Sequence, residues 1–133
     1  MRYLLDTNII SDLVRNPEGA VAQRIAEAGH DNVLTSIIVA SELRFGAAKK
    51  ASPKLTARVD GILTRFSLMP FEAPADIYYG NMRARLESQG RIISENDLLI
   101  ASHALALGCT LVTANEREFA RIDGLKCENW LRS

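Results

Sequence analysis

Short apolar runs alternate along the chain with longer segments in which apolar residues recur at about the 3.6-residue period of a helix. The short runs predict strands at residues 2–5, 33–35, 67–69, 110–113 and 126–128. The longer segments predict helices at residues 7–14, 17–28, 36–50, 53–66, 74–89, 96–107 and 116–119. This alternation favours an α/β fold, and five strands fit a doubly wound parallel sheet.

Proline and glycine mark the expected ends of several helices. Pro17 and Pro74 are expected at helix starts, whereas Gly29, Gly90 and Gly108 are expected just past helix ends. No internal repeat, low-complexity tract or linker interrupts the 133 residues. The sequence therefore predicts a single domain over residues 1–133.

Composition narrows the class of protein. With 47% hydrophobic residues the chain can bury a core, and its 16 basic residues are balanced by 16 acidic ones. This balance argues against a protein that coats nucleic acid by charge alone, but it leaves room for a local basic patch. The amino terminus has no signal-peptide pattern, and no apolar stretch approaches the roughly 20 residues of a membrane span. We therefore expect a cytoplasmic protein that does not enter the membrane.

The sulfur and imidazole side chains offer little chemistry. Cys109 and Cys127 lie in or beside apolar runs, and we expect both to be buried free thiols. There is no CxxC pattern, and His30 lies far from His103 in the sequence. A zinc site is therefore not expected.

Acidic residues give the strongest functional signal. Asp6 directly follows the first predicted strand, at the sheet edge where open α/β folds build their sites. Asp97 and the turn from Glu116 to Glu118 can reach the same edge, and Glu42 can reach it from the helix after the second strand. Carboxylates gathered at one point repel each other, and a divalent cation such as Mg²⁺ or Mn²⁺ relieves that repulsion.

Each acid also has a simpler explanation. Asp6 can cap the first helix, and Asp97 stands three residues after Ser94, which is the spacing of a capping box. Glu118 can be an ordinary solvated charge. Glu42 is harder to explain in this way, because it lies among apolar residues without a lysine four positions away. The shared sheet edge is what favours a joint site.

Several common catalytic motifs are missing from the sequence. It has no GxGxxG or Walker loop and no Gly-x-Ser-x-Gly elbow. Phosphatases that phosphorylate a strand-end aspartate carry Asp-x-Asp, whereas the second acidic position here is Asn8. Nucleotide binding through those loops and the common serine hydrolase route are therefore unsupported, and a phosphatase of that type would lack its general acid.

The segments around these acids resemble the PIN-domain ribonucleases. Residues 5–11 are similar to the opening motif of that family, residues 41–47 to its E-L-x-x-G helix, and residues 96–101 to its D-x-x-I-A helix. Residues 110–119, 124–125 and 128–130 resemble the end of the virulence-associated protein C (VapC) toxins. The likeness spans essentially the whole chain, and four motifs in the same order are more specific than any one of them.

The resemblance implies a Rossmann-like three-layer α/β/α sandwich with a five-stranded parallel sheet. It also implies Mg²⁺- or Mn²⁺-dependent cleavage of RNA, such as a tRNA, by the toxin of a type II toxin–antitoxin pair. The implied partners are a cognate VapB-like antitoxin and a second toxin subunit, as a homodimer within the larger complex.

By motif position, the resemblance assigns catalytic roles to Asp6, Glu42, Asp97 and Glu118, with Glu118 preferred over Glu116 as the fourth acid. Asp6 and Asp97 are the predicted metal ligands. The residues expected to hold Asp6 or to contact phosphate are Thr7, Asn8, Ser11 and Asn115. The sequence departs from the family pattern at Ala114, where asparagine is common, and at Glu95, an additional acid whose role is open.

RNA also requires positive charge outside an acidic pocket. Lys49, Lys50, Lys54 and Arg58 are the main candidates, followed by Arg65, Arg83, Arg85 and Arg91. These residues can equally be the polar faces of amphipathic helices. For Phe45, Tyr78 and Tyr79, core packing is favoured over partner contacts.

Two rival functions remain at the level of sequence. One is a PIN-fold protein or RNA-binding module without catalysis. The other, less favoured, is a phosphatase or receiver-type domain that uses Asp6 as its nucleophile. A receiver requires a further acidic pair near the first strand and a lysine at a late strand end, and the sequence shows neither.

Overall fold

The computed structural model describes residues 1–131 and contains one five-stranded sheet in which every strand is parallel to its neighbours. The strand order is β3-β2-β1-β4-β5. The strands are β1 (Tyr3–Leu5), β2 (Val33–Ser36), β3 (Ser67–Met69), β4 (Thr110–Val112) and β5 (Cys127–Glu128). The predicted five-stranded parallel sheet is confirmed.

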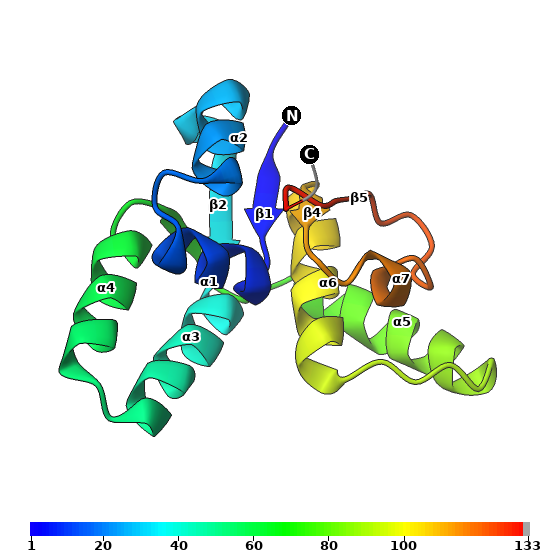
Figure 1. Cartoon of the computed structure of the whole chain (residues 1–133). Coiled ribbons are helices and arrows are strands. Elements are labelled where there is room, and N and C mark those ends of the chain that lie inside the picture. Colours follow the sequence, from blue (N-terminus) through cyan, green and yellow to red (C-terminus); the bar gives the residue numbers. More distant parts are fainter. Residues whose placement is uncertain (132–133) are drawn as a thin grey trace.

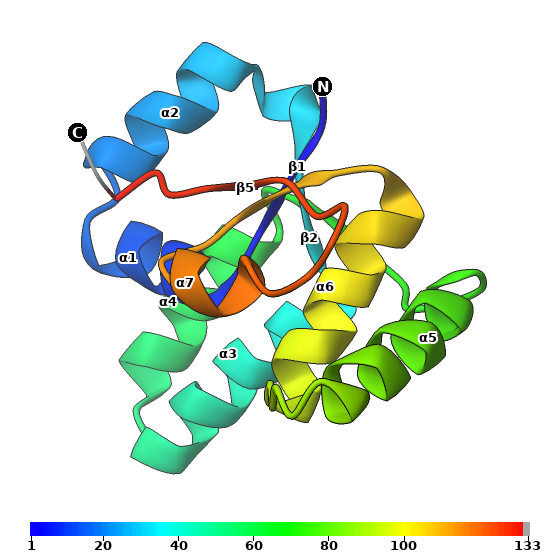
Figure 2. The same cartoon turned by 90° about the vertical axis from the view of Figure 1, so that its right-hand side faces the viewer.

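Helices cover both faces of the sheet. They are α1 (Thr7–Arg15), α2 (Ala20–Ala28), α3 (Ile37–Lys50), α4 (Pro53–Leu63), α5 (Ala75–Ser88), α6 (Glu95–Leu107) and α7 (Glu116–Phe119), with a short 3₁₀ turn η1 (His30–Asn32). Figures 1 and 2 show α1–α4 on one side of the sheet and α5–α7 on the other. The chain moves outward from β1 to β3 and then returns to β4 and β5, so right-handed crossovers place the two groups of helices on opposite faces. The three-layer α/β/α sandwich is thereby confirmed.

Strands β1 and β4 lie side by side in the sheet although they are remote from each other in the sequence. Leu5 is in register with Val112, and the backbone N–H of Asp6 donates to the Val112 carbonyl at 2.9 Å. After these two strands the chain turns to opposite faces of the sheet, which is the arrangement that opens a crevice at the carboxyl ends. The residues that directly follow β1 and β4 therefore meet in that crevice.

Two helix starts differ from the prediction. The second helix begins at Ala20 with Gly19 as its N-cap, and not at Pro17. The Gly19 N–H donates to the Asn16 carbonyl at 3.0 Å, so residues 16–19 form a turn that delays the helix. Pro74 is the N-cap of α5 and not its first residue. The predicted ends at Gly29 and Gly108 are confirmed, and both glycines have positive φ angles of 93° and 69°.

The core lies on both faces of the central strands. Leu4, Leu5, Leu111 and Val112 are each 0% exposed, as expected for a parallel sheet covered on both sides. Trp130 is 1% exposed and packs against Tyr3 with ring centroids 5.2 Å apart. This contact holds the end of the described chain against β1.

The cysteine prediction is confirmed for Cys109, which is a buried free thiol, whereas Cys127 is free but only half-buried. Burial raises the pKa of both thiols, and for Cys127 the negative charges of Glu116 and Asp6 add to the effect, giving a pKa of about 11. Both side chains therefore stay protonated near neutral pH. Among residues 1–131, no helix combines the length and the apolar character that crossing a bilayer demands.

Candidate active site

Asp6 lies at the carboxyl end of β1 and is only 2% exposed. Its Oδ1 accepts a hydrogen bond from the Thr7 N–H at 2.7 Å, and its Oδ2 accepts one from the Thr113 hydroxyl at 2.7 Å. Burial raises the pKa of Asp6, the charge of Glu42 adds to that rise, and the hydrogen bonds from Thr113 and Thr7 oppose it. Asp6 thus caps α1 through one oxygen, as the simpler explanation predicted, while its other oxygen is held by the neighbouring strand.

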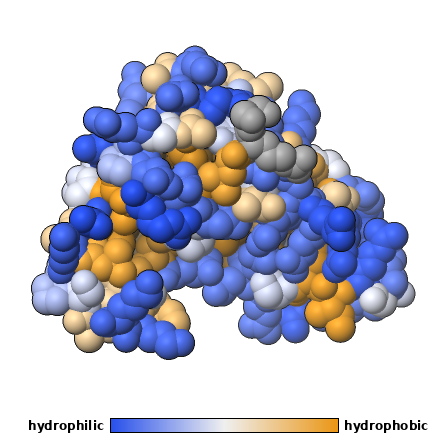
Figure 3. Space-filling model, viewed as in Figure 1, coloured by the Kyte–Doolittle hydropathy of each residue, from blue (hydrophilic) through white to orange (hydrophobic). Residues whose placement is uncertain are grey.

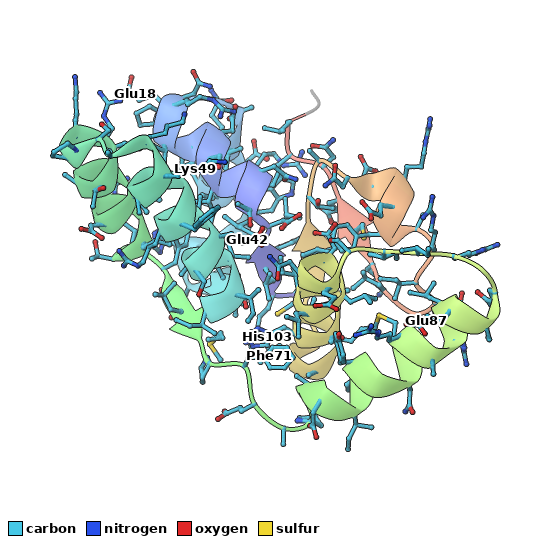
Figure 4. The ribbon with its side chains drawn as sticks, turned by 90° about the horizontal axis from the view of Figure 1, so that it is seen from below. Glu18, Glu42, Lys49, Phe71, Glu87 and His103 are labelled. Atoms are coloured by element: carbon cyan, nitrogen blue, oxygen red, sulfur yellow. The ribbon has the colours of Figure 1, made fainter. Side chains whose placement is uncertain are left out.

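Glu42 approaches the same point from α3, about one and a half turns after the end of β2. The Thr7 hydroxyl donates to Glu42 Oε1 at 3.1 Å, so one residue holds both acids. Burial raises the pKa of Glu42, and the negative charge of Asp97 raises it further. Figure 4 looks onto the carboxyl edge of the sheet and shows Glu42 at the gap between α3 and α6.

Asp97 lies in the first turn of α6, where the Ser94 hydroxyl accepts its backbone N–H at 3.3 Å. The predicted helix cap at Ser94 is therefore present, and it turns the Asp97 carboxylate toward the other acids. Burial, together with the charges of Asp6 and Glu118, raises the pKa of Asp97 from 3.8 to about 6. The cap and the site are compatible, because capping uses the backbone of Asp97 and leaves its side chain available.

The structure separates the two glutamates of α7. Glu118 shares a side-chain hydrogen bond with Asp97, which raises the pKa of Asp97 because a proton between two carboxyl groups is held by both. The charge of Glu116 instead acts on Cys127 in β5. Glu95, the additional acid, lies 3.6 Å from Arg83 in an exposed ion pair. The geometry therefore favours Glu118 as the fourth acid.

A pocket of about 390 Å³ opens above these carboxylates. Its lining comprises Asp6, Thr7, Asn8, Ser11, Arg15, Glu42, Asp97 and Asn115. Figure 3 shows the surface hollowed between the lobe formed by α3 and α4 and the lobe formed by α5 and α6. Every predicted catalytic or supporting residue except Glu118 lines this pocket, and Glu118 reaches it through Asp97.

The side chain of Asn8 and the backbone of Asn115 hold the loop after β4 in place. Asn8 Oδ1 accepts the Ala114 N–H at 3.0 Å, and Asn8 Nδ2 lies 3.5 Å from Asp6 Oδ2. The Asn115 N–H donates to the Thr113 hydroxyl oxygen at 3.0 Å. Ala114, where asparagine was expected, thus contributes its backbone to the support of the site.

Two residues of the site were missed in the sequence. Thr113 follows an apolar strand without any acidic or basic character, and only the pairing of β4 with β1 shows that its hydroxyl meets Asp6. Arg15 had a detectable signal, because it lies four and seven positions after Ser11 and Asn8 and thus shares their helix face. Its side chain is 68% exposed and lies 3.9 Å from Asp12, a weak pairing that leaves the guanidinium close to the acidic pocket.

The four predicted RNA-binding residues lie outside the acidic pocket. Lys49, Lys50, Lys54 and Arg58 are all exposed, at the end of α3 and along α4. Lys50 lines a second pocket of about 310 Å³ that shares Thr7, Ser11, Arg15 and Glu42 with the acidic pocket. Lys49 lies 6.0 Å from the ring centroid of Phe45, and Figure 4 shows it well along α3 from Glu42. Of this group, Lys50 is therefore the best placed near the acids.

The aromatic residues assigned to core packing divide into two groups. Tyr79 packs against the core, as predicted. Phe45 and Tyr78 are 67% and 41% exposed, so the core assignment is wrong for both. Phe45 lies on the exposed face of α3 and Tyr78 on that of α5.

The donor set suits a hard divalent cation. Within residues 1–131, no three His, Cys, Asp or Glu side chains are close enough together to enclose a metal ion. Mg²⁺ does not require such an enclosure, because it commonly binds through one or two carboxylates and completes its octahedron with water and substrate phosphate. The charge of Asp6 already raises the pKa of Asp97, so this is a pair that such an ion would stabilise. The residues present therefore fit Mg²⁺ or Mn²⁺.

Comparison with known proteins agrees with this geometry. The family model of the PIN domain matches residues 3–125. The fold, the sheet-edge acids and this match define one class of protein, and the chain belongs to the PIN-domain family.

Relatives specify the branch of that family. The chain is 41% identical to ribonuclease VapC2 of Rickettsia felis and 34% identical to the tRNA(fMet)-specific endonuclease VapC of Shigella flexneri, with 98% of each chain covered in both comparisons. The structure of VapBC2 from Rickettsia felis bound to a promoter DNA fragment superimposes with a TM-score of 0.91 at 39% identity, covering 98% of this chain and 99% of that one. The structure of VapBC-1 from nontypeable Haemophilus influenzae superimposes with a TM-score of 0.88 at 34% identity, covering 99% of this chain and 100% of that one. These similarities place the chain among the VapC ribonucleases.

Proposed function

We propose that this chain is a metal-dependent endoribonuclease and the toxin of a type II toxin–antitoxin pair, cleaving a structured RNA such as a tRNA and thereby inhibiting translation. The observation that carries the proposal is the convergence of Asp6, Glu42, Asp97 and Glu118 from four separate segments at the carboxyl edge of the sheet. The pKa of Asp6, Glu42 and Asp97 is raised in each case partly by the charge of another acid of the group, and such repulsion destabilises the fold unless the acids serve a positive ligand.

Asp6 and Asp97 are the residues that would hold the cation. A bound Mg²⁺ or Mn²⁺ supplies charge that lowers the pKa of a water molecule and offsets the charge of the phosphodiester oxygens. Thr113 and Thr7 fix both oxygens of Asp6, so its carboxylate is already oriented before any ligand binds. Such preorientation reduces the rearrangement that the reaction requires.

Glu42 is placed to orient the attacking water and to accept its proton. The hydrogen bond from Thr7 holds Oε1, and the pKa of Glu42 is raised by burial and by Asp97, so it is a stronger base than an ordinary glutamate. Arg15, on the rim of the same pocket, supplies the positive charge that would hold the scissile phosphate against acids that repel it.

An antitoxin of the VapB type is the proposed protein partner. Relatives at 39% and 34% identity were solved as VapBC complexes. The exposed Phe45, Ile77 and Tyr78 are apolar side chains of the kind that partners cover, either in an antitoxin or in a second copy of the toxin within a homodimer. Two of these residues, Ile77 and Tyr78, are adjacent on α5.

The decisive experiment is cleavage of initiator tRNA by the purified chain, followed by mapping of the new 5′ ends. Wild type should cleave with millimolar Mg²⁺ or Mn²⁺ and should stop when the metal is chelated. Asp6→Asn and Asp97→Asn should lose cleavage by about two orders of magnitude or more. Asp31→Asn, the same chemical change at an exposed residue just before β2, is the matched control and should remain active.

Wild type and the two aspartate variants also distinguish the proposed function from its rivals. Retained activity in both Asp6→Asn and Asp97→Asn would refute the assignment of the site. A calorimetric titration in which wild type binds no Mn²⁺ would instead favour a binding module without catalysis.

A further inference from the structure

Three arginines converge on the flank of the molecule next to α7, outside the acidic pocket. They line an open pocket of about 470 Å³. Its lining comprises Gly90, Arg91, Ile92, Arg117, Ala120 and Arg121. These residues come from the connection between α5 and α6 and from α7 and the turn after it, which Figure 1 shows on the same side of the sheet. The pocket therefore joins two segments that lie about 25 residues apart in the sequence.

Local structure explains why the guanidinium groups gather there. Gly90 adopts a positive φ of 67° after α5, and the Arg91 N–H returns to the Leu86 carbonyl at 2.9 Å, which turns the chain at Arg91. Arg117 lies in α7 and Arg121 lies in the turn that follows the helix, and both line the pocket. Arg121 donates to the Ile92 carbonyl at 3.1 Å and thereby ties the two segments together.

Acids on the same elements are engaged elsewhere. Glu87 and Glu95 pair with Arg83 at 2.9 and 3.6 Å, and Asp123 pairs with Arg85 at 3.0 Å. Within the described chain, no carboxylate lies within ion-pair distance of Arg91, Arg117 or Arg121. Three positive charges thus share one pocket without an ion-pair partner among residues 1–131.

We propose that the pocket lined by Arg91, Arg117 and Arg121 binds phosphate groups of the RNA strand that leaves the acidic site. Glu118, which contacts Asp97, follows Arg117 directly on α7, so a strand that crosses this helix passes from carboxylates to guanidinium groups. Arginine forks match phosphate oxygens in geometry, and the exposed Ile92 offers apolar contact to a neighbouring base. The inference rests on the ribonuclease function proposed above and identifies where the polyanion is held.

The test compares two double variants of equal charge change. Arg91→Gln/Arg117→Gln removes two guanidinium groups from the pocket and spares Arg121, whose hydrogen bond to Ile92 is structural. Arg2→Gln/Lys126→Gln is the control, because both residues are exposed, form no ion pair in the described structure, and precede β1 and β5 at the opposite edge of the sheet. Each double variant also carries Asp97→Asn, so that the bound RNA is not cleaved. Binding of labelled total tRNA to the two proteins is measured in the presence of a chelator at salt concentrations of about 50 to 200 mM.

The pocket variant should bind tRNA about tenfold more weakly than the control at the lower salt concentration. Its plot of log affinity against log salt should become shallower by about 0.7 for each phosphate of a single-stranded segment that the variant no longer neutralises. Equal affinity and equal slope for the two double variants would overturn the proposal. So would unchanged tRNA binding combined with failure to retain a co-expressed antitoxin, because the pocket would then be a protein interface.

Failure of this proposal is distinguishable from failure of the proposed function. If wild type cleaves tRNA and Asp97→Asn does not, but the pocket variant binds like the control, only the phosphate pocket is refuted. If the pocket variant binds weakly while Asp6→Asn and Asp97→Asn still cleave, only the catalytic assignment is refuted.

Discussion

The hydroxyl of Thr113 lies 2.7 Å from Oδ2 of Asp6, and both side chains are buried at the carboxyl ends of adjacent strands. The same hydroxyl oxygen accepts the Asn115 N–H at 3.0 Å, so its own hydrogen is directed to the carboxylate. A buried carboxylate that accepts a hydrogen bond from a fixed donor keeps its ionised form and its orientation at a lower free-energy cost than a buried carboxylate without such a donor. The register between β1 and β4 therefore determines which side chain donates to the Asp6 carboxylate.

Thr113→Val should weaken both stability and cleavage. Valine has a similar shape but removes the donor to Asp6 and the acceptor for Asn115, which should cost about 1–3 kcal/mol in the free energy of unfolding. The pKa of Asp6 should rise further, so the pH dependence of cleavage should shift to higher pH. Thr113→Ser keeps the hydroxyl and should restore most of the activity in a tRNA cleavage assay. Equal behaviour of the valine and serine variants would show that the hydroxyl is dispensable.

In the absence of metal, the contribution of Asp97 to the free energy of unfolding should fall as the pH rises. The pKa of Asp97 is raised to about 6, so the folded state binds a proton more tightly than the unfolded state. The contribution of Asp97 to the unfolding free energy is therefore most favourable below about pH 4 and falls as the pH rises to about 6. Urea unfolding in chelator should show Asp97→Asn gaining stability relative to wild type across this range.

Glu118→Gln provides the control for that pH dependence. Glu118 raises the pKa of Asp97 by charge and by a shared hydrogen bond, so its replacement should move the transition to lower pH. A transition that stays in place would mean that Glu118 does not act on Asp97, and the fourth acid would then have to be reassigned.

Divalent metal should stabilise the folded chain. A ligand that binds only the native state adds about RT ln(1 + [L]/Kd) to the unfolding free energy, and here it also relieves repulsion between the acids. The melting temperature should therefore rise on addition of millimolar Mg²⁺ or Mn²⁺ and return to its initial value when the metal is chelated. Asp6→Asn and Asp97→Asn should lose most of this rise, whereas Asp31→Asn should retain it. A rise of equal size in all four proteins would place the metal elsewhere.

Arg15→Gln should impair cleavage with little effect on folding. Its side chain is 68% exposed and makes one weak contact with Asp12, so the unfolding free energy should change by less than about 0.5 kcal/mol. Without the charge-assisted hydrogen bond from Arg15 to phosphate, kcat/KM should fall by about tenfold. Arg15→Lys keeps the charge but not the fork and should recover part of that activity, whereas Arg2→Gln should behave as wild type.

His103 should make the fold sensitive to acid. It is 1% exposed, its Nδ1 lies 2.7 Å from the Ser36 hydroxyl, and its ring packs edge-on against Phe71 at 5.4 Å, as Figure 4 shows for the two labelled side chains. Burial lowers the pKa of His103, so the neutral ring supports the folded state fully above about pH 6.5 and that support is lost as the pH falls.

His103→Phe tests this directly. At pH 8 the variant should be less stable by about 1 kcal/mol, because it cannot form the hydrogen bond with Ser36. The difference should shrink or reverse near pH 5, because only wild type must then keep a buried ring uncharged. A constant difference across that range, measured by urea unfolding, would contradict the proposed cause.

Local patterns were sufficient for most of the elements. Apolar runs located all five strands. The central strands β1, β2 and β4 are largely buried, as expected for a parallel sheet covered on both faces, whereas the edge strands β3 and β5 are less buried. Helix ends at glycine were placed correctly where the backbone needs a positive φ, as at Gly29 and Gly108. The start predicted at Pro17 was wrong, because the hydrogen bond from Gly19 to Asn16 favours a turn over the first helical residues.

The acidic residues could be named from sequence because strand ends and helix starts confine side chains to one sheet edge. The choice between Glu116 and Glu118 depended on which side of a single helical turn faces Asp97, and side chains two residues apart on a helix point in different directions. Thr113 gave no local signal, and Arg91 was named only as one of several possible RNA-binding residues, because the groups that these residues meet lie on other elements.

The order of apolar and polar residues by itself determined the strands, the helices and the set of acids, since these follow from the backbone's local preferences and from burial. The pairing of the strands and the packing of the helices decided which distant residues meet. Only the pairing of β1 with β4 brings Thr113 to Asp6, and only the packing of α7 beside the turn after α5 brings Arg117 to Arg91. Contacts between distant residues depend on how whole elements are placed, and no short stretch of sequence contains that information.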